Sequence, residues 1–170
     1  MIRTLDFNAF SAGTIIDDEY ADLGVTVSAS GGSGDAMIFD SANPTGGDND
    51  LASDTLEGLL IVSEDGDQSD PDDNAGGGSL FFDFDDMVRM KGVTFKDIEE
   101  TSGEGTRVIF YDDNGDVIQN HYVQPTGDGG ERFVQFNIDG VSRFEVRFEG
   151  SGAIDNVIFD DDKPAGGGND

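Results

Sequence analysis

The sequence contains no cysteine and no tryptophan, and nine lysines and arginines stand against 37 aspartates and glutamates. Without cysteine, the chain can form neither a disulfide bond nor a thiolate metal site. Nucleic-acid binding needs clustered Lys and Arg to contact phosphates, so a formal net charge of −28 argues against such a partner. No apolar stretch reaches the length that spans a bilayer, and we expect no membrane insertion.

The side chains of common catalytic machinery are also scarce. His121 is the single histidine, and no GxSxG motif is present, so catalytic triads and zinc sites lack parts. A pair of carboxylates could hydrolyse a glycoside, but among so many acids no pair stands out. We therefore predict that the chain is not an enzyme, with a glycan hydrolase as the least favoured alternative.

The acidity itself has three interpretations: several calcium sites, adaptation to a saline, halophilic habitat, or simple solubility. Asp outnumbers Glu about three to one, and the shorter Asp side chain suits cation-binding loops. A secreted domain without disulfides also needs another source of stability, which bound calcium can supply. Calcium is the cofactor that we predict, with or without a saline habitat.

Short runs of alternating or β-branched residues recur about every ten positions, separated by turn residues, and no amphipathic helix is visible. The pair Asn114-Gly115 between two such runs predicts a tight hairpin. The expected strands cover residues 4–10, 23–29, 36–39, 59–62, 79–84, 88–95, 107–111, 117–123, 133–138, 141–148 and 153–159.

This pattern predicts an all-β fold, an antiparallel jelly-roll β-sandwich with long Asp/Gly-rich calcium-binding loops. The 13 phenylalanines fall mostly within the expected strands and supply its core. We expect a single domain over residues 1–160, followed by a flexible acidic and glycine-rich tail over residues 161–170.

The acidic run of residues 39–74 surrounds one apolar strand and contains most of the candidate metal ligands. Asp48 and Asp50 stand one residue apart in GGDNDL, where glycines permit both carboxylates to face one point. The stretch 64–74 matches neither the EF-hand loop nor the repeated calcium β-roll motif, and remains a generic cation loop. For each stretch the alternative is a solvated polar loop. The predicted ligands of this run are Asp40, Asp48, Asp50, Asp65 and Asp72.

Three further aspartates lie outside this run. Asp97 follows the expected strand that ends at Phe95, where it either joins a site at the end of the sandwich or is solvated. Asp155 interrupts the apolar last strand, where an unpaired carboxylate is costly, and we expect a backbone irregularity near Asn156. First and last strands often lie side by side in sandwiches, so Asp6 and Asp155 could meet; the alternative is that both point outward.

The motifs GGDNDL, PDDNAGG and GAIDNVIF give the chain, from about residue 5 to residue 159, a resemblance to β-sandwich domains of secreted bacterial proteins, including surface and PEP-CTERM-type exported ones. The last motif is also similar to the final strand of calcium-binding carbohydrate-binding jelly rolls. The resemblance implies that Asp155 and Asp6 hold a structural calcium. The chain differs from the sugar-binding members of these families in that it has no tryptophan.

These observations together predict a non-catalytic calcium-binding module of a secreted or cell-surface bacterial protein, with an adhesive or structural role. The alternative is a calcium-dependent carbohydrate-binding module. The expected partners are calcium ions and an extracellular glycan or surface protein. The first ten residues contain no apolar core of a signal peptide, which leaves open a removed signal, another export signal or a cytosolic location.

Overall fold

The computed structural model describes residues 1–162, which form nine strands and two short 3₁₀ segments, with no α-helix among them. The predicted all-β class is confirmed. Within this part of the chain, no helix has the length and apolar character needed to cross a bilayer. The strands are β1 (Ile2–Leu5), β2 (Val25–Ser30), β3 (Ala36–Asp40), β4 (Gly58–Val62), β5 (Gly78–Lys96), β6 (Arg107–Tyr111), β7 (Val117–Tyr122), β8 (Glu131–Phe148) and β9 (Ala153–Asp160), and the 3₁₀ segments are η1 (Ala21–Leu23) and η2 (Asn49–Leu51).

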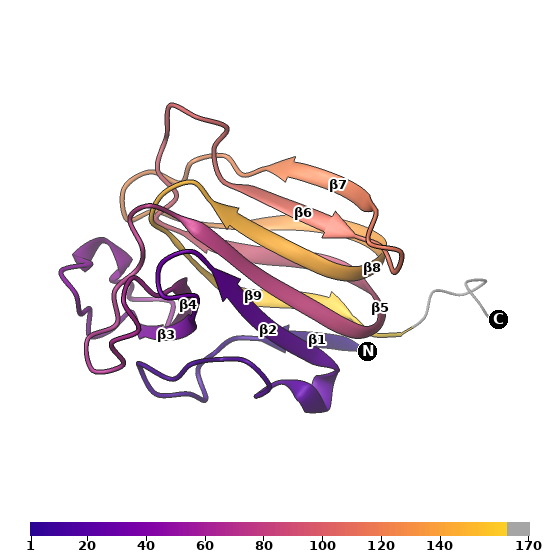
Figure 1. Ribbon diagram of the computed structural model, residues 1–170, viewed down its shortest axis with the longest axis horizontal. Coiled ribbons are helices and arrows are strands. Elements are labelled where there is room, and N and C mark those ends of the chain that lie inside the picture. The colour runs from indigo at the N-terminus through magenta and orange to yellow at the C-terminus, as the bar shows by residue number, and fades with distance from the viewer. Residues whose placement is uncertain (163–170) are drawn as a thin grey trace.

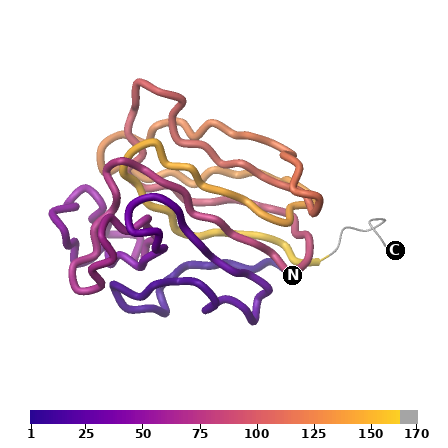
Figure 2. Tube along the Cα trace, in the orientation of Figure 1, coloured from indigo at the N-terminus to yellow at the C-terminus, as the bar shows by residue number. Residues whose placement is uncertain are grey.

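Two long strands, β5 and β8, pair with each other and bend together, so that each contributes to both layers of an antiparallel β-sandwich. Residues 78–84 and 141–148 lie in one layer with β2, β6 and β7. Residues 88–96 and 131–138 lie in the other with β9, which pairs on its far side with β1 and β4, and β4 pairs with β3. Figure 1 shows the two layers face to face, and Figure 2 follows the chain through the bend.

The bend corrects the strand boundaries that the sequence predicts. Residues 79–84 and 88–95 belong to one strand, as do residues 133–138 and 141–148, because the pairing of β5 with β8 continues past the interruption. Register shifts between Asp83 and Val88, and again as far as Gly92, mark bulges in β5. On β8, Asn137 and Gly140 have φ angles of 71° and 73°. Bulges bend a strand without ending its pairing.

The core between the layers is rich in phenylalanine. Phe144 stacks on Phe82 with ring centroids 4.5 Å apart, and Phe84 and Phe110 contact the same ring at 6.0 and 6.1 Å. A smaller apolar cluster lies beside β3 and β4 and is closed by the loop that contains η2. Its buried members are Met37, Phe39, Leu51, Leu59, Ile61 and Ala153.

The ends of the sandwich confirm two predictions and correct one. β1 and β9 pair, as expected of first and last strands, and the Asn114-Gly115 turn joins β6 to β7. β1 covers residues 2–5 rather than 4–10, because Phe7 adopts a φ of 62° that ends the extended backbone. Of the expected tail, residues 163–170 lie outside the described residues.

Candidate metal centre

The acidic loops gather at the end of the sandwich opposite the bend. The β3–β4, β4–β5 and β7–β8 loops and the segment after β5 all meet there, because β5 returns to this end after bending. Two groups of carboxylates form in this region, and each combines residues from different loops. One group contains Asp50, Asp97, Glu99 and Asp128, and the other contains Asp48, Asp72 and Asp73.

Asp97 is the structural centre of the first group. It follows directly on β5 with a φ of 61°, a left-handed conformation that an aspartate tolerates better than most residues. Its own N–H donates to the carbonyl of Gly130 at 2.8 Å, and its Oδ1 accepts from the N–H of Gly129 at 2.8 Å. These two bonds fix the carboxylate on the β7–β8 loop.

The other oxygen of this carboxylate has no partner. Asp97 is fully buried, with 0% of its surface exposed, and its Oδ2 accepts no hydrogen bond. A buried anionic oxygen without a donor or cation is costly. Three other acids lie at ligand spacing from it: Asp50 from η2, Glu99 from the segment after β5 and Asp128 from the β7–β8 loop.

The spacing of this first group fits one hard cation. One carboxylate oxygen from each of the four residues lies within 4.8 Å of the others. Oxygens that bind calcium at about 2.3–2.6 Å can be no more than about 5 Å apart. Backbone carbonyls fill the remaining positions in such loop sites, and the loops of Asp50 and Gly129 touch, since a Cβ on Gly129 would lie 3.3 Å from the Asp50 carbonyl oxygen.

The protonation behaviour of Asp97 reflects this crowding. Burial raises the pKa of Asp97 to about 7, and repulsion by Asp50 adds to the rise, whereas the Gly129 hydrogen bond opposes it. A proton can therefore neutralise the carboxylate near neutral pH when no cation does so. Protons and a cation compete for the same oxygen.

In the second group, Asp73 is the buried member. Its Oδ2 accepts from the N–H of Gly152 at 2.8 Å, and its own N–H donates to Asp48 Oδ2 at 2.8 Å. Burial raises the pKa of Asp73 to about 8, and repulsion by Asp48 adds to this. The pKa of Asp72 also rises to about 7, first through burial and then through Asp48. Hydrogen bonds between loops therefore explain the close approach of these three aspartates without a bound ion.

Asp155 lies on β9 and Asp6 directly follows the neighbouring strand β1, but the two differ in burial. Asp155 is 2% exposed and accepts from the N–H of Asn156, where a φ of 42° marks the irregularity expected in this strand. Burial raises the pKa of Asp155 to about 7, and Asp6 and Glu57 add to the rise. Asp6 itself is exposed and caps the N–H of Asn8 at 3.1 Å. Among the described residues they share no group of three acids at ligand spacing.

The last two predicted ligands serve local turns. Asp40 accepts from the N–H of Ala42 and from the amide of Asn43, and Asp65 accepts from the N–H of Asp67. Neither belongs to a carboxylate group at ligand spacing within residues 1–162. Side chains that cap their own turns are common for aspartate in loops.

The structure thus brings together Asp50 with Asp97, and Asp48 with Asp72. Glu99, Asp128 and Asp73 join these pairs without having been predicted as ligands. Asp128 stands beside two glycines in GDGG, the same Asp-and-Gly composition that marks the other acidic loops. This composition could have marked Asp128 as a candidate ligand, but it does not indicate which distant loop Asp128 meets.

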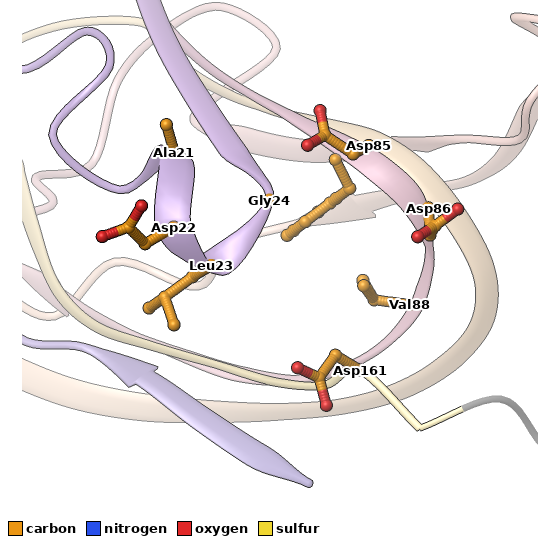
Figure 3. A pocket seen from close by; sticks show the side chains of 9 residues that line it. Ala21, Asp22, Leu23, Gly24, Asp85, Asp86, Val88 and Asp161 are labelled. Atoms are coloured by element: carbon orange, nitrogen blue, oxygen red, sulfur yellow. The ribbon is translucent and has the colours of Figure 1, made fainter.

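A further acidic hollow lies near the bend. A cavity of about 320 Å³ has Leu23, Phe84 and Val88 in its lining, and Asp85 and Asp161 are among four aspartates around it. Figure 3 shows these carboxylates spread around the rim rather than converging on one point. Such spacing suits hydration of the acids, and we place no ion there.

The raised pKa values predict an unusual pH dependence of the metal-free protein. The ordinary pKa of an aspartate is 3.8, and the folded pKa values of Asp97 and Asp73 are about 7 and about 8. Between these limits the folded state binds more protons than the unfolded state. The resulting stabilisation is complete below about pH 4 and is lost as the pH rises through about 7 to 8. In chelator, the urea midpoint should therefore be higher at pH 5 than at pH 8.

The matched control for this prediction is Asp97→Asn, which removes one of the titrating groups and should reduce the difference between the two midpoints. A midpoint in chelator that is higher at pH 8 than at pH 5 would show that these carboxylates are not protonated in the folded state.

No protein-family model and no curated protein sequence matches the chain. Among solved structures, the K2 cleaved adhesin domain of Lys-gingipain aligns over 94% of this chain and 99% of its own, with a TM-score of 0.51 and 12% identity. An F5/8 type C domain from Bacteroides fragilis covers 86% and 95%, with a TM-score of 0.42 and 13% identity. The lectin domain of lectinolysin complexed with Lewis B antigen covers 94% and 90%, with a TM-score of 0.36 and 9% identity. The adhesin-domain alignment shows a shared β-sandwich fold.

Proposed function

We propose that the chain is a non-catalytic adhesion module of a secreted or surface-exposed bacterial protein, and that calcium stabilises one end of its sandwich. Asp50, Asp97, Glu99 and Asp128 would hold the ion. The bound cation would supply positive charge directly between these four carboxylates. The four residues would hold together η2, the segment after β5 and the β7–β8 loop.

The observation that carries this proposal is the unpartnered Oδ2 of the fully buried Asp97. Three further acids, Asp50, Glu99 and Asp128, lie at ligand spacing from it. Lys96 is close in sequence, but its Nζ donates to the carbonyl of Gly129 at 2.6 Å and lies 3.6 Å from Glu131. A cation between the four acids would resolve an arrangement that is otherwise unfavourable.

The ligand set favours calcium over other common ions. The available atoms are carboxylate and carbonyl oxygens, which suit hard cations rather than zinc or copper. Calcium accepts six to eight oxygens in irregular geometry, whereas magnesium requires a smaller, nearly octahedral site. The four carboxylates come from three irregular segments of the chain, which suits the irregular coordination of calcium.

The adhesive role is supported by the fold that the chain shares with an adhesin domain. The position of the single histidine supports a non-catalytic role, since His121 packs edge-on against Phe136 with ring centroids 5.1 Å apart. Burial lowers the pKa of His121.

The test is calorimetric titration of the chelator-stripped protein with calcium, comparing Asp97→Asn with the parent. Asparagine suits the left-handed backbone at this position, so the fold should persist while calcium affinity falls at least about tenfold. Asp113→Asn removes the same charge from the exposed β6–β7 turn and is the matched control. Equal calcium affinity in the parent and both variants would overturn the site.

A second candidate function is glycan binding. It is favoured by a cavity of about 540 Å³ on the outside of the β5–β8–β6 layer, where Phe81, Tyr111, Ser142 and Arg143 provide aromatic surface, hydroxyls and a guanidinium. Ligand sites combine apolar and aromatic surface with a few well-placed polar groups. Retention of the protein by immobilised polysaccharides would test this function in general.

A further inference from the structure

Positive charge is scarce in this chain, and three arginines lie together on one sheet face. Arg107 on β6 and Arg143 and Arg147 on β8 account for three of the nine lysines and arginines. Arg107 lies opposite Arg147 in the pairing of β6 with β8, and Tyr111 lies opposite Arg143. Alternate residues of a strand share a face, so these side chains lie on the outside, opposite the phenylalanine core. We name this surface, defined by Phe81, Arg107, Tyr111, Arg143 and Arg147, the arginine face.

A buried carboxylate organises the middle of the arginine face. Glu145 is 5% exposed, and its oxygens accept from Ser79 at 2.6 Å, from Tyr111 at 3.1 Å and from Arg147 at 3.0 and 3.3 Å. A buried acid with this many donors is a preorganised network. It fixes the Tyr111 ring and the Arg147 guanidinium in place before any ligand arrives.

The other two arginines are held less completely by the protein. The buried Nε atoms of Arg107 and Arg143 donate no hydrogen bond. Arg143 Nε lies 3.4 Å from Asp83 Oδ1, an ion-pair distance without hydrogen-bond geometry, and its guanidinium stacks over Phe81 at 4.4 Å. Arg107 lies over the Tyr122 ring at 5.7 Å. An acceptor from outside the protein can reach the terminal guanidinium nitrogens but not these buried Nε atoms. The Arg143 side chain is 43% exposed, whereas Arg107 Nη1 already donates to Asn120 Oδ1 at 3.3 Å.

Two hollows lie along this face, one at each end. The cavity of about 540 Å³ contains Arg143 and Tyr111 in its lining, and a cavity of about 280 Å³ contains Arg107 and Arg147. The four residue steps of β6 between Arg107 and Tyr111 span about 13 Å. An occupant that reaches both hollows must therefore be an extended chain rather than a single small molecule.

The charges around the hollows define the chemistry of that chain. Asp83, Asp85, Asp112 and Asp113 line the larger hollow beside the single cation Arg143, and the whole molecule carries a charge of −28. A polyanion would be repelled at this end. Closely spaced guanidinium donors and carboxylate acceptors instead complement neutral hydroxyl groups, which both donate and accept.

We propose that the arginine face binds a neutral, hydroxyl-rich glycan chain lying along β8 between the two hollows. This inference rests on the second proposed function, glycan binding, and assigns it a place and a ligand class. Arg107 and Arg143 donate to hydroxyl and ring oxygens, and Asp83 and Asp112 accept from hydroxyls. Tyr111 and the 41%-exposed Tyr122 provide apolar surface for sugar C–H groups.

The test is affinity gel electrophoresis in gels that contain galactomannan, xyloglucan, laminarin or, as the polyanion, alginate. We expect retardation by at least one neutral polysaccharide and none by alginate. Arg107→Gln and Arg143→Gln should each weaken the apparent affinity about tenfold or more. Arg89→Gln, at an arginine of the other layer whose partner is Asp139, should bind like the parent, and the melting temperature of each variant reports its folding.

Three outcomes would overturn the proposal and are distinguishable. Undiminished retardation of folded Arg107→Gln and Arg143→Gln would move the glycan site elsewhere while leaving glycan binding itself intact. Retardation by alginate alone would replace the neutral ligand class by an anionic one. Absence of retardation by every polysaccharide, for a parent protein that melts cooperatively, would remove glycan binding as well as the assigned face.

Discussion

Calcium added to the chelator-stripped protein should raise its melting temperature by about 10 °C. Occupation of a site that exists only in the folded state contributes RT ln(1 + [L]/Kd), about 4 kcal/mol at a ligand concentration of 1,000 Kd. For a domain of this size, each kcal/mol shifts the melting temperature by roughly 2–4 °C. The effect is large because the ion would replace repulsion among Asp50, Asp97, Glu99 and Asp128 by attraction at a point where three segments meet.

Differential scanning calorimetry in calcium and in chelator measures this shift. Magnesium at the same concentration is the control and should give a smaller rise, since it fits an irregular multi-carboxylate site less well. In Asp97→Asn the calcium-dependent rise should be reduced, and in chelator this variant should melt no lower than the parent because one repulsive charge has gone. Identical melting curves of the parent with and without calcium would refute the stabilising role of the ion.

Phe144→Ala should destabilise the fold by about 4 kcal/mol, a large fraction of the total stability of an ordinary domain. Phe144 is fully buried and contacts the rings of Phe82, Phe84 and Phe110, which belong to two neighbouring strands. Its removal leaves a cavity where β5, β8 and β6 pack against the opposite layer. Urea unfolding in saturating calcium provides the measurement, with the metal contribution held constant.

Phe133→Ala is the matched control, because the same side chain is lost from a position on β8 that is 48% exposed. We expect a loss of about 1 kcal/mol there, as exposed positions far from the core tolerate truncation. If the two variants unfold at the same urea concentration, the stacked phenylalanines between the layers are not the main apolar core.

Short-range sequence patterns predict much of this fold correctly. Alternation and β-branching indicate β2, β3, β4, β6 and β7 to within a few residues. Asn114-Gly115 correctly predicts the hairpin turn between β6 and β7. In the last strand, the backbone irregularity lies at Asn156 as expected. These features depend on neighbours within a few positions.

Long-range geometry is where sequence reasoning fails. Asp83 to Val88 resembles a break between strands, and only pairing with β8 shows that the backbone bends and continues. Asp50, Asp97 and Asp128 are tens of residues apart, and their convergence depends on the return of β5 to the loop end. Asp40 and Asp65 resemble them in composition but cap local turns. Composition therefore indicated acidic loops, and the topology determined which acids meet.

A crystal structure would locate the ion directly. Crystals grown in calcium, with terbium substituted for its anomalous signal, would give the position of each bound cation. We expect a peak within ligand distance of Asp97 Oδ2 and of carboxylate oxygens from Asp50, Glu99 and Asp128. A fully ordered loop end without a peak there, or cations only at other carboxylates, would contradict it.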